Sequence, residues 1–304
     1  MSAGDITNAL VLGRRRKGRD NDAAVAAVRD ELRAAGWKVT GRVVKRKRTL
    51  RRLARRAARS GCDVVVAVGG DGAVVRVASS LARTETALAI VPTGTGNLLA
   101  GNLGIPHDRQ SAIRTVLTGR RRRIDFGRVS SGGKDRGFAV ACGIGFDAGV
   151  MGATSPAEKL RWGKLAYIAN AIDRSGTLRN ARHEITLDGV RTTMDAAQVF
   201  VANFGRMLPV VAPRRRIRGD DGFLDVLAIR AAGPLPGLLA GWEALTQTDL
   251  GESDGGRVFR ARAKEVTIDS QPRRLVEADG SVVGRTPVSV SVRRAALTVI
   301  VPRR

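Results

Sequence analysis

Aromatic residues, cysteine and histidine are scarce in this chain of 304 residues. Phe, Trp and Tyr make up only 4%, so small aliphatic side chains must fill the core, and few rings can stack on nucleic-acid bases. Cys62 and Cys142 lie in apolar stretches, which is typical of buried thiols in a reducing compartment and excludes a disulfide framework. His107 and His183 have no partner pattern nearby. We expect both at the surface rather than in a catalytic or metal site.

The sequence also lacks a secretory signal and a long apolar run. The apolar patch near the N-terminus precedes a basic stretch, which is the wrong order for a signal peptide. The longest candidate, residues 226–245, is interrupted by Arg230, Pro234 and Glu243 and falls short of the ~20 apolar residues that a spanning helix needs. With 43% hydrophobic residues the chain can still bury a core. We therefore expect a cytoplasmic protein without a transmembrane helix.

Acidic residues are in the minority, with 28 Asp and Glu against 53 Lys and Arg, which gives a formal net charge of +25. The basic residues form blocks at 14–17, 45–48, 120–123 and 214–216. Such a surface attracts polyanions, whether nucleic acid, an anionic membrane or a phosphorylated substrate. Charge blocks alone specify no partner, so an arginine-rich solvated surface stays open as the alternative.

The two halves of the sequence show different patterns. The first alternates predicted strands with predicted helices, which is typical of a parallel α/β sheet. The strands are at 9–13, 38–47, 63–68 and 86–92, and the helices are at 20–39, 49–61 and 73–83, with a further helix starting at 98–103. From about residue 126 strands follow one another, which indicates a mostly antiparallel β domain; they are predicted at 136–145, 183–190, 196–204, 223–230, 263–270, 274–281, 288–294 and 296–302, with one helix at 156–174. We expect domains at 1–125 and 126–294, with residues 295–304 packing back on the first.

Two glycine-rich loops follow neighbouring buried strands. The first is Gly69-Gly70-Asp71-Gly72, and the second is "PTGTGN" at 92–97. Glycines let the backbone approach a ligand, and a helix start presents free N–H groups to phosphate. A carboxylate in such a loop makes sense if it reaches Mg²⁺, directly or through water; the alternative is that Asp71 is a helix N-cap. Two such loops at adjacent strand ends predict a two-sided pocket.

Together the two loops resemble the signature of the diacylglycerol kinase catalytic-domain family, which includes soluble bacterial lipid kinases and the sphingosine and ceramide kinases. NAD kinases share only the first loop. Further segments resemble the family along nearly the whole chain: "RRRIDFGRV" at 121–129, "GIGFDAGVM" at 143–151, "KLRWGKLAYI" at 159–168, "DDGFLDV" at 220–226, "EADGSVVGRTPVSVSV" at 277–292 and "ALTVIVP" at 296–302.

The resemblance implies a diacylglycerol-kinase-like and NAD-kinase-like fold and a set of site residues. The ATP phosphates would be held by Gly69, Gly70, Asp71, Gly72, Ala73, Val74, Val75, Gly94, Thr95 and Asn97. Asp71 and Asp125 would join a Mg²⁺–water network at the γ-phosphate. A second, structural Mg²⁺ would be bound by Asp221 and the carbonyl oxygens of Arg218 and Phe223; the alternative for Asp221 is an Asx-turn.

The sequence departs from the family pattern at several positions. Ala73, Val75 and Leu98 stand where members usually have Thr, a polar residue and, in many, Asp. Members also usually have Glu, the presumed general base, at the position of Ser281. Asp279 is our candidate for the base, with Glu277 as a second substitute, because on one extended strand both would share the face of Ser281. The alternative is that Asp279 belongs to an Asp-Gly hairpin turn.

The resemblance implies an ATP-dependent kinase that phosphorylates the hydroxyl of diacylglycerol. Another lipid alcohol, such as a sphingoid base or a polyprenyl-type acceptor, is the alternative substrate, and a catalytically impaired lipid- or nucleotide-binding relative is the alternative class. A lipid substrate implies transient docking at the anionic inner membrane surface. Nucleic acid is disfavoured, because no nucleic-acid module is recognisable. A homodimer stays open.

Overall fold

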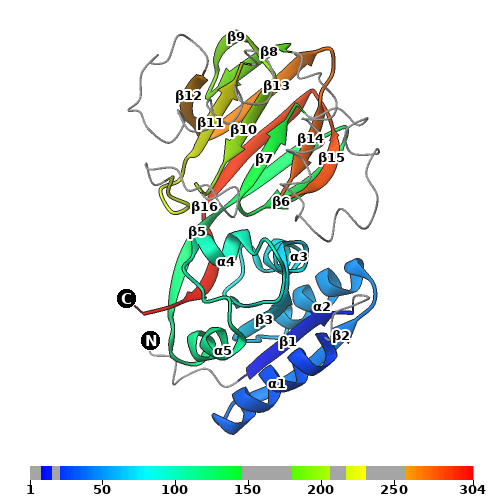
Figure 1. Ribbon diagram of the computed structural model, residues 1–304, viewed down its shortest axis with the longest axis vertical. Coiled ribbons are helices and arrows are strands. Elements are labelled where there is room, and N and C mark those ends of the chain that lie inside the picture. The colour runs from blue at the N-terminus through cyan, green and yellow to red at the C-terminus, as the bar shows by residue number, and fades with distance from the viewer. Residues whose placement is uncertain (1–7, 16–20, 146–179, 206–216, 231–257, 304) are drawn as a thin grey trace. The chain divides into compact units, whose positions relative to one another are not determined.

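The computed structural model describes residues 8–15, 21–145, 180–205, 217–230 and 258–303. The predicted helix at 156–174 and the arginine block at 214–216 lie outside these residues. The chain divides into two compact units, residues 1–126 with 294–304, and residues 127–293. These limits lie within one residue of the predicted boundaries, and β5 and β16 each run from one unit into the other (Figure 1).

The first unit is an α/β domain whose strands are parallel and follow the order β2-β1-β3-β4-β16. The strands are β1 (Asn8–Arg14), β2 (Lys38–Val44), β3 (Val64–Gly69), β4 (Ala87–Pro92) and the end of β16 (Val288–Val301). Every residue of β3 and β4 is buried. Runs of Val, Ala and Ile fit this position, because a central parallel strand is covered on both faces.

Helices cover both faces of this sheet. They are α1 (Asn21–Ala34), α2 (Lys47–Arg59), α3 (Asp71–Leu81), α4 (Leu98–Asn102) and α5 (Arg109–Thr118). Helices α1 and α5 share one core with Val64, Val66 and Val68 of β3. Helices α2 and α3 contact each other and pack against β1 and β3, where they bury Leu50 and Val77. The alternating order of strands and helices places the loops after β1, β3 and β4 at the same edge of the sheet.

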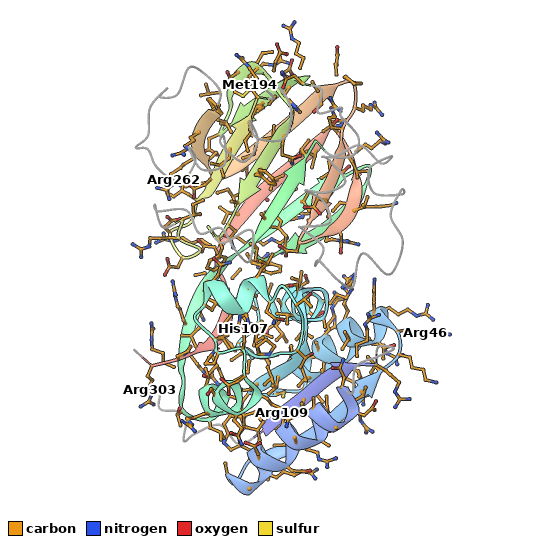
Figure 2. All side chains as sticks on the ribbon, in the orientation of Figure 1. Arg46, His107, Arg109, Met194, Arg262 and Arg303 are labelled. Atoms are coloured by element: carbon orange, nitrogen blue, oxygen red, sulfur yellow. The ribbon has the colours of Figure 1, made fainter. Side chains whose placement is uncertain are left out.

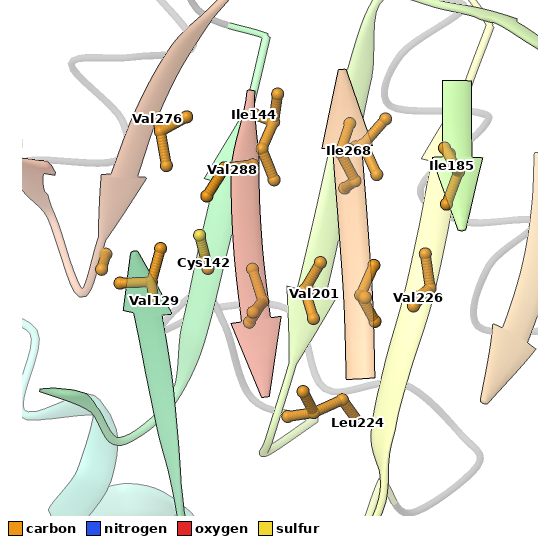
Figure 3. Packing of buried hydrophobic residues seen from close by; sticks show 14 of the residues in the cluster. Val129, Cys142, Ile144, Ile185, Val201, Leu224, Val226, Ile268, Val276 and Val288 are labelled. Atoms are coloured by element: carbon orange, nitrogen blue, oxygen red, sulfur yellow. The ribbon is translucent and has the colours of Figure 1, made fainter. Parts of the chain in front are cut away.

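The second unit is an antiparallel β-sandwich. One sheet has the order β12-β11-β10-β7-β14-β15, and the other contains β13, β8 and β9 beside the first half of β16, with β5 and β6 paired to it. The strands are β5 (Arg120–Ser131), β6 (Lys134–Phe138), β7 (Ala141–Ile144), β8 (Ala181–Leu187), β9 (Val190–Ala196), β10 (Gln198–Ala202), β11 (Leu224–Ile229), β12 (Val258–Ala263), β13 (Glu265–Gln271), β14 (Leu275–Ala278) and β15 (Ser281–Arg285). Valine and isoleucine side chains from both sheets form the core between them (Figure 3).

The structure confirms the predicted fold class and changes some of the predicted elements. The strands expected at 288–294 and 296–302 are one continuous strand, β16, although Ala295 within it has φ +47°. Helix α5 and strands β5, β9, β12 and β15 were not predicted. The strand expected at 136–145 is two strands, β6 and β7. No helix in the described part of the chain is long and apolar enough to cross a membrane.

The surface position expected for both histidines is found for only one of them. His107 is exposed, as expected, but the prediction of a surface position for His183 is wrong, because this side chain is fully buried. Its Nε2 lies 3.0 Å from the carbonyl oxygen of Ala196, and its Nδ1 lies 2.9 Å from Oγ of Ser270. Burial lowers the pKa of His183. Both cysteine thiols are free and buried, as predicted, and burial raises the pKa of each.

Candidate functional site: two glycine loops at the sheet edge

The loops after β3 and β4 touch each other through their glycines. A Cβ added to Gly94 would lie 2.6 Å from Cα of Gly70, and one added to Gly69 would lie 2.9 Å from Cβ of Ala73. Neither position can carry a side chain without moving its neighbour. The close approach of the two loops therefore accounts for Gly70, and packing against Ala73 accounts for Gly69; the approach brings the predicted phosphate-binding segments 69–75 and 94–97 together.

Asp71 connects the two loops directly. Its Oδ1 accepts a hydrogen bond of 2.6 Å from the backbone N–H of Leu98. This N–H belongs to the first turn of α4, where a helix has no internal acceptor for it. The N-cap alternative for Asp71 is wrong, because α3 begins at Asp71 itself and its N-cap is Gly70, without a side-chain cap. Oδ2 of Asp71 faces Gly96, where an added Cβ would lie 2.8 Å away.

Asparagine side chains fix the shape of the second loop. Asn97 has φ +46°, and its amide accepts from the N–H of Gly94 at 3.0 Å and donates to the carbonyl of Gly94 at 2.9 Å. Asn21, nearly fully buried, accepts from Oγ1 of Thr93 at 3.4 Å and donates to the carbonyl of Arg14 at 2.5 Å. Hydrogen bonds therefore connect the loops after β1, β3 and β4 at one edge of the sheet. The role of Asn21 was missed, since an asparagine at a helix start is common.

The arrangement can bind phosphate groups. Helix α3 directs its first-turn N–H groups and the positive end of its dipole to this edge. Thr95 is exposed beside it, so its hydroxyl is accessible to a ligand. Val74, in contrast, is buried and serves the core, so only its backbone can take part.

Comparison with known proteins agrees with this geometry. Residues 8–129 match the family model of the diacylglycerol kinase catalytic domain, and residues 140–301 match the model of the YegS C-terminal NAD kinase beta sandwich-like domain. This chain belongs to the diacylglycerol kinase catalytic-domain family.

Individual members show how far the similarity to this kinase family extends. The chain is 30% identical over 262 residues to the diacylglycerol kinase of Mycobacterium tuberculosis, covering 83% of this chain and 81% of that protein. It is 31% identical over 287 residues to a Pseudomonas putida protein named "Probable lipid kinase YegS-like", covering 93% and 91%. A crystal structure of a diacylglycerol kinase from Bacillus anthracis has the same fold, with a TM-score of 0.75, 22% identity and 97% of each chain covered.

Asp125, the second residue expected to join the Mg²⁺–water network, forms a hydrogen bond with the backbone of β16. Its side chain is fully buried on β5, and Oδ1 accepts a hydrogen bond of 2.7 Å from the N–H of Ala295. A left-handed conformation at alanine is costly, and this hydrogen bond helps to hold it. Asp125 therefore supports β16 where that strand enters the first unit. Its part in the Mg²⁺–water network stays a prediction.

The candidate base, Asp279, lies in a two-residue hairpin turn. Asp279 and Gly280 have φ +45° and +69° and connect β14 with β15, which is the turn held as the alternative. The carboxylate of Asp279 accepts from the N–H groups of Ala139, Val140 and Ala141, at 2.6, 3.0 and 3.2 Å. A carboxylate has about four lone-pair sites, so three of them are occupied by the backbone.

The expected common face of residues 277, 279 and 281 is wrong. The hairpin turn lies between Glu277 and Ser281, so they do not belong to one extended strand. Ser281 pairs with Ala278, and Glu277 pairs with Val282. Directly paired residues point to the same face of a sheet, so Ser281 and Glu277 point to opposite faces. Glu277 instead lies beside Gly143, its partner on β7.

The residues expected to hold a structural Mg²⁺ do not fit that ion as they are arranged. Oδ1 of Asp221 accepts from the N–H of Phe223 at 3.1 Å, which is the Asx-turn held as the alternative, and Oδ2 accepts from Arg262. A guanidinium beside this carboxylate repels a second cation. Among the described residues no group of three or more His, Cys, Asp or Glu side chains could hold a metal ion.

Proposed function

We propose that this protein is an ATP-dependent lipid kinase that transfers the γ-phosphate to the hydroxyl of diacylglycerol. The observation that carries the proposal is the pair of glycine loops joined by Asp71, because transfer of a phosphoryl group depends chiefly on holding the phosphates and neutralising their charge. The hydroxyl oxygen of the lipid forms a bond to the γ-phosphorus, the bond from that phosphorus to the β–γ bridging oxygen breaks, and ADP leaves.

Asp71 is the candidate ligand of Mg²⁺. Its Oδ1 accepts the hydrogen bond from the N–H of Leu98, which leaves Oδ2, next to Gly96, as the oxygen that would bind the ion. Carboxylate oxygen is a preferred ligand of this ion, which would neutralise phosphate charge when bound. Asp71 would then position the metal and, through Leu98, the second loop.

The hydroxyl proton needs an acceptor, and the usual family glutamate is Ser281 here. Asp279 remains our candidate, although three backbone N–H groups already use its carboxylate. The Ser281→Glu variant tests whether a base is missing. If the native site lacks a strong base, this variant raises kcat by about 10²-fold, the lower end of what general base catalysis supplies. An unchanged kcat in a well-folded variant would show that the native base is sufficient.

We propose that helix α2 docks the enzyme on the anionic inner surface of the membrane, where the lipid substrate lies. Its apolar side chains Leu50, Ala54 and Ala57 are buried, and its basic face is exposed. A hollow of about 500 Å³ is lined by Arg48, Arg51, Arg52, Arg55, Arg56 and Arg59. Within the part of the chain that the structure describes, these six arginines make no ion pair with a carboxylate. Each basic residue near an anionic bilayer contributes about 1 kcal/mol.

The substrate assignment is tested with purified protein, ATP, Mg²⁺ and a panel of lipid alcohols in mixed micelles. The panel contains diacylglycerol, a sphingoid base and a polyprenyl alcohol, and phosphorylated lipid is detected. We expect the highest kcat/KM with diacylglycerol. A higher value with another lipid would replace the substrate, and ATP binding without transfer to any lipid would favour a catalytically impaired relative.

A further inference from the structure

An arginine side chain lies at the loop before β11, where the structural Mg²⁺ was expected. Arg262 lies on β12, the edge strand of its sheet (Figure 2), directly opposite Asp225 of β11. Its Nη2 donates to Oδ2 of Asp221, and its Nε lies 3.8 Å from Oδ1 of Asp225. One guanidinium therefore lies between two carboxylates that are both about three-quarters buried, with side-chain exposures of 25% and 22%.

An aromatic ring completes this arrangement. The guanidinium carbon of Arg262 lies 4.7 Å from the ring centroid of Phe223, and Nζ of Lys264 lies 5.4 Å from the same centroid. The face of an aromatic ring attracts cations. Phe223 is also the residue whose N–H is held by Asp221 in the Asx-turn. The turn, the ring and the two carboxylates are thus all organised around cationic side chains.

A divalent ion cannot share this position with the guanidinium. Mg²⁺ requires near-ideal octahedral oxygen ligands at about 2.0–2.1 Å, whereas both oxygens of Asp221 already accept hydrogen bonds. Two cations a few ångströms apart also repel each other strongly when they are partly buried. A guanidinium, in contrast, offers several N–H donors in a fixed plane, which suits two neighbouring carboxylates.

We propose that the Arg262 guanidinium replaces a structural divalent cation in this chain, and that it stabilises the 218–223 loop without metal. The inference does not depend on the proposed function. It implies that Mg²⁺ does not stabilise the second unit of the native protein, and that removal of Arg262 leaves Asp221 and Asp225 as a pair of carboxylates able to bind Mg²⁺.

The test measures Tm of the metal-stripped full chain with millimolar Mg²⁺ or with NaCl of equal ionic strength, in the absence of nucleotide. The native protein should show the same Tm in both. Arg262→Gln should lower Tm by about 2–5 °C, and Mg²⁺ should then raise it again, since a ligand that binds only the folded state stabilises it. Adding Asp221→Asn to this variant should abolish the response.

Arg260→Gln is the matched control, because Arg260 lies two residues away on the same strand and the same face, directly opposite Leu227 rather than Asp225. This variant should not gain a Mg²⁺ response. The proposal is overturned if Mg²⁺ raises Tm of the native protein as much as that of Arg262→Gln, or if the loss of Arg262 produces no Mg²⁺ response. If Arg262→Gln does not fold, Arg262→Lys, which keeps one positive charge, serves in its place; it should lose Tm but remain insensitive to Mg²⁺.

Discussion

The two carboxylate oxygens of Asp71 differ in their surroundings. Oδ1 accepts a hydrogen bond from the N–H of Leu98, and Oδ2, the oxygen proposed to bind Mg²⁺, lies against Gly96. Substitution by alanine would remove both functions, so it cannot separate catalysis from loop geometry. Asparagine can separate them, because its Oδ1 still accepts the hydrogen bond from Leu98 while the negative charge is lost.

We therefore predict that Asp71→Asn retains the Tm of the native protein and loses at least about 10²-fold in kcat, the range found when one electrostatic contact to a reacting centre is removed. The measurements are phosphorylated lipid formed per minute and a thermal melt. Asp108→Asn is the control, because Asp108 caps helix α5 in the same unit and should leave kcat unchanged. Full activity of Asp71→Asn would rule out the metal role.

His183 predicts a pH dependence of stability. Burial lowers its pKa in the folded protein below the usual value of 6.5, so the unfolded chain binds this proton more readily. The stabilisation is fully present above pH 6.5 and is lost as the pH falls through the folded pKa. Because the chain has only two histidines and His107 is exposed, His183 should dominate this range.

The corresponding measurement is Tm between pH 7.5 and pH 5 for the native protein and for His183→Gln, conditions chosen to bracket the histidine range. Glutamine is uncharged throughout this range, so the Tm of the variant should decline less steeply toward pH 5. At pH 7.5 the variant should be less stable than the native protein, because it loses the contacts of the buried imidazole with Ser270 and Ala196. The His107→Gln control should follow the native curve. A decline of equal steepness in all three would assign the pH dependence to carboxylates instead.

At the scale of single elements, helix α2 concentrates positive charge on its exposed face. Its buried side is made of small aliphatic residues, and its exposed side is almost entirely arginine. Like charges at spacings of three and four residues destabilise a helix in solution. The packing of Leu50 and Ala54 must offset this repulsion, and an anionic surface would relieve it.

We predict that the quadruple Gln variant of α2 binds anionic vesicles more weakly and with a shallower salt dependence, while Tm stays the same or rises. The substituted residues are Arg51, Arg52, Arg55 and Arg56. Exposed surface charges are screened beyond about 10 Å at 0.1 M salt, so the difference from the native protein should shrink at high salt. Turnover should fall on anionic vesicles but not on a short-chain dispersed acceptor.

A control with the same loss of charge keeps this test specific. Four exposed arginines elsewhere in the first unit are replaced by Gln: Arg109, Arg114, Arg120 and Arg121. If docking depends on α2, this control binds vesicles like the native protein. Equal weakening in both variants would mean that only net charge matters, and tight binding of both to nucleic acid but not to vesicles would change the class of partner.

At the scale of the whole molecule, the last residues of the chain complete the first unit. Val299 pairs with Leu88 of β4, and the N–H of Arg83 bonds to the carbonyl of Ala296. Leu297 is fully buried there. The glycine loops follow β3 and β4, so the stability of the proposed ATP site depends on a segment more than 200 residues away in sequence.

We predict that Leu297→Ala destabilises the protein by about 2–5 kcal/mol, as is usual when a buried leucine is truncated. The loss should appear as a lower Tm and as faster hydrogen exchange in residues 64–69 and 87–92. Val190→Ala is the control, since Val190 is 73% exposed and its truncation should change neither measurement. If hydrogen exchange in β3 and β4 is unchanged, the end of β16 does not contribute to the stability of the proposed site.

The sequence by itself determined the fold class, the two units and the two loops of the candidate site. Continuous Val and Ala runs, as in β3, identify buried parallel strands, and glycines next to them identify tight turns, because both signals are local. The resemblance to the kinase family rests on the same local motifs.

Only the tertiary structure decided which partner each polar side chain of these segments contacts. That Asp71 bonds to Leu98, that Asp279 holds the N–H groups of three residues near 140, and that Arg262 lies at Asp221 each depends on segments far apart in sequence. Burial of His183 likewise results from the pairing of β8 with β13. A polar side chain acquires its role from the partner opposite it, and strand pairing, which brings distant residues together, is not encoded in any single local pattern.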